Sequence, residues 1–574
     1  MLRGIGTSKG IGMGQALLIV DQDVEIRVEK IPDTEIDAEI QRFLDAKEQF
    51  IKDTEKMITD LSVQLGEQEK TALVLKNQIY LIKDVELNDG VENLIRAQKI
   101  CAEAALNDTC ELYINIFSQM DNETMNQRVV DIVDMKSRMI RILQGIQDVD
   151  LSHIEPGTVI VAKELHPSMT ALMDTSHIAG IIAEKGGDTS HAAILARALE
   201  IPAVLSVKNV CDKVHNGESV IVDGEYGEVF INPIQKTIEI YEKKRTVFLE
   251  HREELKKYID KNTETADGAR VMLAANIGNA EDAAKAMEAG AEGIGLFRTE
   301  FLFMNGISMP TEEQQFEAYR KVAVLCKEKP VIIRTLDIGG DKDIPYMGLT
   351  KETNPFLGYR AIRFCLDRVD VFTVQLRALL RASAYGTIRI MFPMITSLQE
   401  IISVKKMIRD ICQNLDQNGI DYDKNIQIGI MIETPAAAVM ADVFAREVNF
   451  FSIGTNDLTQ YMMAVDRGNE NVSYLYSTLN PAVLRMIRYI IQCGHEHGIS
   501  VGMCGEAAGD SRMLPLLLAF GLDEFSVTAS KVLDTRKSIA DWTMKDAKDV
   551  TAHVMKLCTD KEISNYLSDC IMNK

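Results

Sequence analysis

One histidine, His191, ends the run Gly-Gly-Asp-Thr-Ser-His at residues 186–191 and is followed by an Ala/Ile/Leu-rich stretch. The glycines allow a tight turn, Thr189 or Ser190 can cap a helix, and the apolar stretch favours one. We therefore predict His191 in the first helical turn, at a natural anion site beside unpaired N–H groups. A neutral ring nitrogen there could carry a phosphoryl group. The alternative is a capping histidine without chemistry.

A second set of candidates follows the apolar segments of the C-terminal half, which end repeatedly in polar residues. They are Asn276, Arg298, Thr299, Glu300, Arg334, Thr335, Asp337, Glu433, Asn456, Asp457, Cys504, Glu506 and Thr528. Charged groups are costly at strand ends unless they meet a ligand. Arginine matches phosphate and carboxylate, and Glu433 with Asp457 could hold Mg²⁺. We interpret the pattern as a site for an anionic phosphorylated substrate, with structural salt bridges as the alternative.

The segments that carry these side chains alternate with helical stretches after Gly268. Eight strands are predicted, at residues 271–275, 293–297, 331–334, 387–392, 427–432, 450–453, 499–503 and 524–527. Eight alternating units are typical of a (β/α)₈ TIM barrel, whose active site lies at the carboxyl ends of its strands. Residues 263–574 are therefore assigned to a barrel domain.

The N-terminal half combines two kinds of pattern. Residues 1–20 and 146–232 contain short apolar strands and predict one α/β domain, with helices opened by residues 167–170 and by His191. Residues 21–145 have helical periodicity and predict an inserted helical domain. Its helices are expected in a long first stretch and then at residues 67–83, 90–118 and 122–144.

Residues 233–262 form a highly charged segment with helical periodicity. Its apolar residues recur at steps of three, four or seven and share one face: Ile234, Ile238, Tyr241, Phe248 and Leu255. A charged helix between domains predicts a linker that permits relative domain motion.

The 574 residues carry a formal net charge of −22, which argues against nucleic acid as a partner. The acidity favours a basic protein partner or serves solubility alone. Four acids of the helical block, Glu67, Glu69, Asp84 and Glu86, could meet such a partner or form a solvated face. The sequence contains no long apolar run and no signal pattern, so we expect no membrane insertion. Its ten cysteines form no CxxC pair, which indicates a reducing cytoplasm.

Five motifs in one order resemble the enzyme I family of the bacterial phosphoenolpyruvate:sugar phosphotransferase system, and the resemblance runs from residue 1 to 574. The motifs are GGDTSHAAILAR (186–197), GIGLFRTEFLF (293–303), RTLDIGGDK (334–342), NPFLGYRAIR (354–363) and FSIGTNDLTQY (451–461). The resemblance implies a swivelling phosphohistidine α/β domain with a helical insertion, followed by the barrel.

The resemblance also implies a phosphotransferase that acts on a nitrogenous acceptor group. Phosphoenolpyruvate would phosphorylate His191 with Mg²⁺, and the phosphoryl group would pass to the phosphocarrier protein HPr, which binds the helical insertion, for sugar uptake. Family members dimerise through the barrel. The residues that match the family's substrate, metal and acid positions are Arg298, Arg334, Asn456 and Arg467 for phosphoenolpyruvate, Glu433 and Asp457 for Mg²⁺, and Cys504 as proton donor.

One stretch departs from the family pattern. The HPr-binding helix of the family often has a histidine followed by aliphatic residues, whereas the corresponding stretch here begins with Gln78 and ends with Asp84. The departure concerns the contacts with the partner and leaves the chemistry of His191 unchanged.

Two other functions share some of these features. Pyruvate phosphate dikinase and phosphoenolpyruvate synthase also combine a phosphohistidine domain with a barrel, but they need a large ATP-binding module, and no P-loop is present. A regulatory protein that senses phosphoenolpyruvate without turnover would be expected to lack the histidine or a metal ligand, and both are present.

Overall fold

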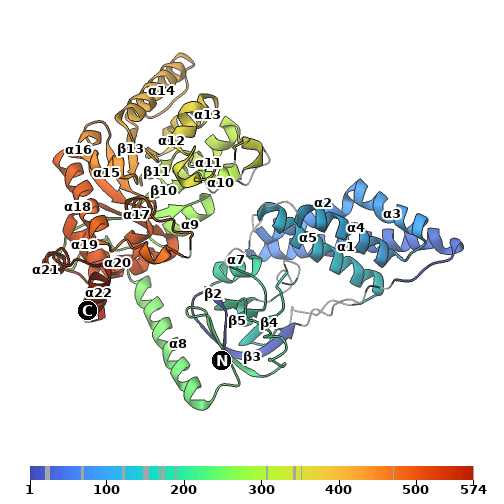
Figure 1. Cartoon of the computed structure of the whole chain (residues 1–574). Helices are drawn as coiled ribbons and strands as arrows, with labels where there is room; N and C mark the ends of the chain where they lie inside the picture. The colour runs from blue at the N-terminus through green and yellow to red at the C-terminus, as the bar shows by residue number, and fades with distance from the viewer. Residues whose placement is uncertain are drawn as a thin grey trace. The chain divides into compact units, whose positions relative to one another are not determined.

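The computed structural model describes residues 1–19, 26, 28–65, 70–118, 123–146, 154–166, 169, 173, 175–187, 190–304, 308–339, 344–350, 352–469 and 471–572. The chain forms two compact units, Met1–His251 and Arg252–Lys574 (Figure 1). The helix start predicted at residues 167–170 lies mostly outside the described residues, as do Glu67 and Glu69.

The first unit contains an eight-stranded sheet with the order β1-β8-β7-β3-β4-β5-β6-β2. β3 pairs parallel with β4 and antiparallel with β7, so the N-terminal segment completes the sheet as predicted. The helical block between β3 and β4 is therefore an insertion. The strands are β1 Leu2–Arg3, β2 Ile5–Ser8, β3 Ile11–Ile19, β4 Thr158–Ala162, β5 Ile178–Ala183, β6 Ala203–Leu205, β7 Ser219–Asp223 and β8 Glu228–Ile231.

The insertion packs its helices around a separate core that includes the fully buried Phe43 and Phe50. Its helices are α1 Ile36–Leu65, α2 Lys70–Lys83, α3 Val85–Gln98, α4 Ala102–Ser118 and α5 Glu123–Gln144. The single helix predicted at residues 90–118 is wrong. Lys99 adopts a left-handed φ of 56°, and residues 99–101 pair with residues 29–31 through backbone hydrogen bonds, which separates α3 from α4.

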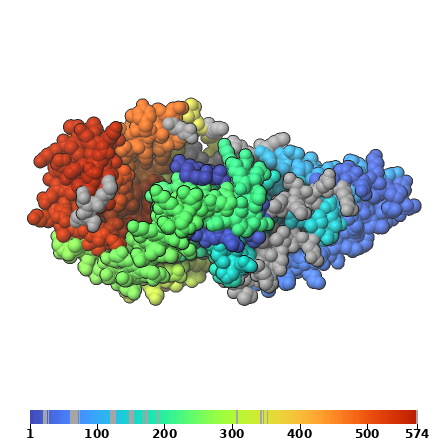
Figure 2. All heavy atoms as spheres, turned by 90° about the horizontal axis from the view of Figure 1, so that it is seen from below, coloured from blue at the N-terminus to red at the C-terminus, as the bar shows by residue number. Residues whose placement is uncertain are grey.

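The charged segment forms one continuous helix, α8 Gln235–Lys256, and the boundary between the two units falls inside it. Most of its residues are exposed to solvent, as the space-filling view in Figure 2 illustrates in light green. Tyr241 and Leu255 are buried as the periodicity predicts. Ile234 instead precedes the helix and is 70% exposed, so it does not extend the apolar face.

Both ends of α8 have side-chain contacts with the unit to which they belong. Near its start, Tyr241 donates a hydrogen bond from its hydroxyl to Glu228 on β8 at 3.0 Å. Just beyond its last residue, the fully buried Arg536 donates to the carbonyls of Tyr258 and Ile259, at 2.9 and 3.2 Å. Arg536 also donates to the hydroxyl of Thr263 at 3.0 Å.

The second unit is a closed barrel of eight parallel strands, which confirms the predicted fold class. The strands match the predicted segments to within two residues because most of the apolar runs end at a polar residue. They are β9 Met272–Ile277, β10 Ile294–Arg298, β11 Val331–Arg334, β12 Ile388–Phe392, β13 Gln427–Ile432, β14 Phe450–Ile453, β15 Ser500–Met503 and β16 Glu524–Thr528.

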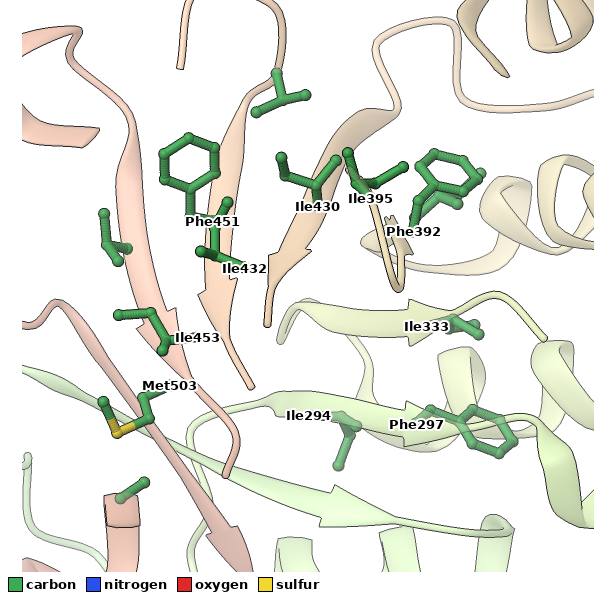
Figure 3. Packing of buried hydrophobic residues seen from close by; sticks show 14 of the residues in the cluster. Ile294, Phe297, Ile333, Phe392, Ile395, Ile430, Ile432, Phe451, Ile453 and Met503 are labelled. Carbon is green, nitrogen blue, oxygen red and sulfur yellow. The ribbon is translucent and has the colours of Figure 1, made fainter. Parts of the chain in front are cut away.

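Helices follow the barrel strands and bury one face of each strand. Side chains such as Phe297, Ile333 and Phe392 form the layer shown in Figure 3 and are at most 2% exposed. The helices are α9 Ala280–Glu288, α10 Glu300–Met304, α11 Glu312–Cys326, α12 Ile362–Asp367, α13 Val369–Ala382, α14 Leu398–Gln417, α15 Pro435–Val439, α16 Ala441–Phe444, α17 Thr455–Met463, α18 Pro481–Glu496, α19 Leu514–Phe520, α20 Val532–Ala540, α21 Met544–Val554 and α22 Asp560–Met572.

A second apolar cluster is formed by Leu296, Ile332, Met391, Met431, Phe450 and Cys504, which come from six of the eight strands or their ends. Alternate strand residues point to opposite faces of a sheet, so this cluster is the filling of the barrel interior. Among the described helices, none has both the length and the apolar character needed to cross a membrane. All ten cysteines are free thiols.

Candidate active site at the carboxyl end of the barrel

Strand register brings the predicted residues of the barrel to one end. Arg298 and Arg334 are the last residues of β10 and β11 and are register partners. Glu433 follows Ile432, whose partner on β14 is Ile453, and Asp457 lies in the first turn of α17 just beyond. Cys504 follows β15, which is the neighbour of β14. Parallel strands therefore collect these side chains at the end where barrel enzymes place their chemistry.

Arg334 is buried among acidic side chains. It forms a short ion pair with Glu300, and its Nη1 lies 3.2 Å from Asp337 Oδ2. Burial acts against its charge, but Glu300 and Asp337 outweigh burial and raise the pKa of this guanidinium. The Nε atom of Arg334 and Oε2 of Glu300 are buried and have no hydrogen-bond partner in the described part of the chain. Unpaired buried polar atoms are costly, so a water or a polar ligand that reached them would stabilise the site.

Arg360 is a site residue that the candidates chosen from the sequence did not include. It donates from Nε and Nη2 to Asp337 at 2.9–3.1 Å, and from Nη2 to Asp457 at 3.2 Å. It therefore connects the end of β11 with α17. Its position in the motif at residues 354–363 was the available signal, although it reaches the site from a loop and not from a strand end.

Glu433 and Asp457 form a pair of buried carboxylates. Glu433 is 2% exposed, and its Oε1 accepts a hydrogen bond from the N–H of Met394 at 2.6 Å. Burial, followed by the negative charges of Asp457 and Asp337, raises the pKa of Glu433 well above its usual range. A divalent cation would relieve this repulsion, so the oxygen donors fit Mg²⁺.

The described residues contain no group of three or more His, Cys, Asp or Glu side chains that could hold a metal ion. A cation between Glu433 and Asp457 would therefore take further ligands from substrate oxygens or water. That is the usual arrangement for Mg²⁺, which keeps few protein ligands.

The remaining predicted substrate residues line the rim. Arg298 is exposed at the surface, although partial loss of water around its guanidinium, followed by the positive charge of Arg334, lowers its pKa. It has no ion pair within the described residues, so its charge is available to a ligand. Asn456 exchanges hydrogen bonds with Glu506 at 3.2 Å, and Arg467 Nη1 lies 4.0 Å from Asp457 Oδ1.

Cys504 lies below this rim and is 4% exposed. Burial raises the pKa of its thiol to about 11, although a hydrogen bond with Ser452 acts in the opposite direction. The thiol therefore keeps its proton at neutral pH. The side chain of Asn276 donates to the Cys504 carbonyl at 3.0 Å and holds the backbone of this position.

His191 begins helix α7, His191–Ala198, as the sequence predicts. Ser190 is the N-cap, and its hydroxyl accepts a hydrogen bond from the N–H of Ala193 at 3.3 Å. Gly186 has a φ of 111°, a left-handed conformation that favours glycine. The side chain of His191 and the neighbouring Asp188 and Thr189 lie outside the described residues. His191 belongs to the first unit and the barrel residues to the second.

Three family models match successive parts of the chain. They describe the N-terminal part of phosphoenolpyruvate-utilising enzymes at residues 3–128, their mobile domain at residues 154–227 and their phosphoenolpyruvate-binding domain at residues 252–544. The fold and the matches together define the class: the chain is a phosphoenolpyruvate-utilising enzyme.

Similar proteins of known name identify the family within this class. The chain is 42% identical over 572 residues to the phosphoenolpyruvate-protein phosphotransferase of Staphylococcus carnosus (strain TM300), covering 100% of this chain and 99% of the relative. It is 44% identical over 566 residues to that of Geobacillus stearothermophilus, with 99% and 97% covered. The chain therefore belongs to the phosphoenolpyruvate-protein phosphotransferase family, as its motifs predicted, and the assignment to the dikinases is set aside.

A solved structure is also similar to part of the chain. The solution structure of "Enzyme I (nEIt)" is 37% identical, with a TM-score of 0.39, and the match covers 43% of this chain and 99% of that chain.

Proposed function

We propose that the protein transfers the phosphoryl group of phosphoenolpyruvate to His191 in an Mg²⁺-dependent reaction, releases pyruvate, and passes the group on to HPr. The observation that carries the proposal is the meeting of Arg298, Arg334 and Arg360 with the carboxylate pair Glu433 and Asp457 at one end of the barrel. Phosphoryl transfer needs positioning and charge neutralisation more than covalent help from side chains.

In this proposal, Arg298, Arg334, Asn456 and Arg467 bind phosphoenolpyruvate. The exposed guanidinium of Arg298 offers an unpaired fork to a carboxylate or phosphate, and the buried Arg334 remains charged because Glu300 and Asp337 surround it. Glu433 and Asp457 are the proposed Mg²⁺ ligands. Bound there, Mg²⁺ would supply positive charge to the phosphate oxygens.

Cys504 is the proposed acid. When the phosphorus–oxygen bond of phosphoenolpyruvate breaks and a phosphorus–nitrogen bond forms at His191, an enolate remains. The Cys504 thiol would give its proton to the methylene carbon of that enolate and so complete pyruvate. The raised pKa of the thiol supports this role because it keeps the proton in place until the enolate forms.

His191 then acts as a shuttle between the barrel and HPr. Its place at the start of α7, with the Ser190 cap beside it, suits a phosphoryl group that must be held and then surrendered. We assign the phosphohistidine domain to residues 1–20 and 146–232, the HPr-binding domain to 21–145, the linker to 233–262, and the substrate-binding and dimerising domain to 263–574. The free cysteines support a reducing, cytoplasmic setting.

The stretch that departs from the family pattern contains both buried and exposed side chains. Gln78, which replaces the histidine frequent in the family, is fully buried and donates to Asp134 at 2.9 Å. It is therefore a core residue, and we assign it no contact with HPr. Asp84 and Glu86 are both exposed, but Asp84 caps α3 by accepting from the N–H of Leu87 at 3.1 Å, so Glu86 is the better candidate for a partner contact.

The test is transfer of labelled phosphate from phosphoenolpyruvate to the full-length protein, with and without HPr and Mg²⁺. The wild type should become labelled with Mg²⁺ and lose its label to HPr, and His191→Ala should not be labelled. Labelling of His191→Ala would reject the carrier assignment. Labelling from ATP and not from phosphoenolpyruvate would support a dikinase-like reaction instead.

A further inference from the structure

A network of buried polar side chains lies behind Arg298 and Arg334. None of its members is a proposed substrate-binding or metal-binding residue. Gln375 on α13 is 1% exposed and stands at its centre. Its Oε1 accepts from the N–H of Leu336 at 2.9 Å, and its Nε2 donates to the hydroxyls of Thr299 and Tyr319, both at 3.2 Å.

Each branch of this hydrogen-bond network ends at a backbone carbonyl. Thr299 donates from its hydroxyl to the backbone carbonyl of Arg334 at 2.9 Å. Tyr319, on α11, donates to Gln315 Oε1 at 3.1 Å, and Gln315 donates to the carbonyl of Pro310 at 3.0 Å. Each donor hydrogen has one acceptor, so the network is satisfied only with the Gln375 amide in this orientation. Thr299 and Tyr319 are fully buried, which makes each of these hydrogen bonds costly to lose.

The network holds backbone on both sides of the arginine pair. Thr299 directly follows Arg298, and Leu336 comes two residues after Arg334. Gln375 therefore ties the end of β10 to the end of β11, at the register pair Arg298 and Arg334. No apolar side chain could replace it, because this position needs one acceptor and two donors.

We propose that Gln375 is a positioning residue for phosphoenolpyruvate: acting through Thr299 and Leu336, it sets the separation and direction of the guanidinium groups of Arg298 and Arg334. This inference rests on the proposed function of the two arginines. Gln375 itself contacts neither substrate nor reacting atoms. Because the two arginines are the proposed substrate ligands, displacement of their guanidinium groups should weaken phosphoenolpyruvate binding and not only lower stability.

The test compares Gln375→Met with the matched control Tyr319→Phe in the full-length protein. Both variants delete hydrogen bonds of the same buried network, but Tyr319 lies on the branch that leads away from the arginines. Gln375→Met should raise the KM for phosphoenolpyruvate by roughly tenfold or more, with a smaller effect on kcat. Tyr319→Phe should lower the melting temperature and leave the KM unchanged. Equal KM values in the two variants would overturn the proposal.

A second pair of variants decides the question if Gln375→Met does not fold. Thr299→Val removes the hydroxyl that donates to the Arg334 carbonyl and accepts from Gln375, whereas Thr299→Ser keeps a hydroxyl at this position. The valine variant should show the raised KM and the serine variant a KM near that of the wild type. A normal KM in Thr299→Val would refute the proposal. Failure of the wild type to take phosphate from phosphoenolpyruvate would instead reject the proposed function, so the two failures are distinguishable.

Discussion

Replacement of Asp337 by alanine should destabilise the barrel by a predictable amount. The Asp337 side chain is 3% exposed and is shared by two buried guanidinium groups, Arg334 at 3.2 Å and Arg360 at 2.9 Å. Removal of one partner from a buried ion pair costs about 3–5 kcal/mol, because the remaining charge stays buried. Arg334 keeps Glu300 and Arg360 keeps Asp457, so we expect the lower end, about 3 kcal/mol.

The chain offers a direct probe for this measurement. Its only tryptophan, Trp542, is 4% exposed and belongs to the second unit, so its fluorescence reports on unfolding of the barrel. Chemical denaturation followed at Trp542 should therefore show the loss in Asp337→Ala.

The matched control is Asp370→Ala. Asp370 also pairs with an arginine, Arg368 at 2.9 Å, but this pair is exposed, and exposed pairs contribute little. The variant should unfold close to the wild type. A loss of less than about 1 kcal/mol in Asp337→Ala, the size typical of a surface pair, would refute the view that Asp337 is the shared counter-ion of both arginines.

Four further predictions concern the proposed chemistry and the linker. Glu433→Ala should abolish Mg²⁺-dependent labelling from phosphoenolpyruvate and leave HPr binding intact, as measured by calorimetry; unchanged labelling would remove Glu433 from the metal site. Because the pKa of Glu433 is raised, its protonated form stabilises the metal-free fold below the ordinary glutamate pKa, and this stability is lost as pH rises through the raised value. The Mg²⁺-induced rise in melting temperature should therefore be larger at alkaline than at acidic pH, and a pH-independent rise would contradict this. Cys504→Ala should slow pyruvate formation by roughly 10²–10⁴-fold, as followed by a coupled lactate dehydrogenase assay, and a normal rate would exclude the thiol as the acid. Lys243→Pro, at an exposed position of α8, should break the helix and slow HPr phosphorylation while phosphoenolpyruvate binding persists. Equal loss of HPr phosphorylation and of phosphoenolpyruvate binding would argue against the linker role.

The strand ends of the barrel could be predicted because their chemistry is local. An apolar run that stops at Arg298, Arg334 or Glu433 marks both the end of a strand and a candidate ligand. The position of His191 could be predicted for the same reason, because the glycine pair and the Ser190 cap indicate the helix start within a few residues.

Other features depend on distant parts of the chain. The break at Lys99 has no glycine or proline to mark it and follows from pairing with residues 29–31. Arg360 enters the site from a loop, beside Ala361 with a φ of 53°. Gln375 lies on a helix, where a polar residue usually faces solvent, and only the packing of α13 against the strand ends buries it. None of these could be read from local periodicity.

The attachment of α8 at both ends has a mechanical consequence. Phe248 lies over Gly10 of the first unit, and Arg536 holds the carbonyls that follow the helix in the second. Between these two attachments lie residues 249–257, which are mostly exposed apart from the buried Leu255. Bending near residue 252 would act as an elastic joint: the helix extends about 25 Å from there to its start, so a deflection of about 10° displaces that end by roughly 4 Å. The stiffness of this segment would then set how readily the first unit, which carries His191, moves.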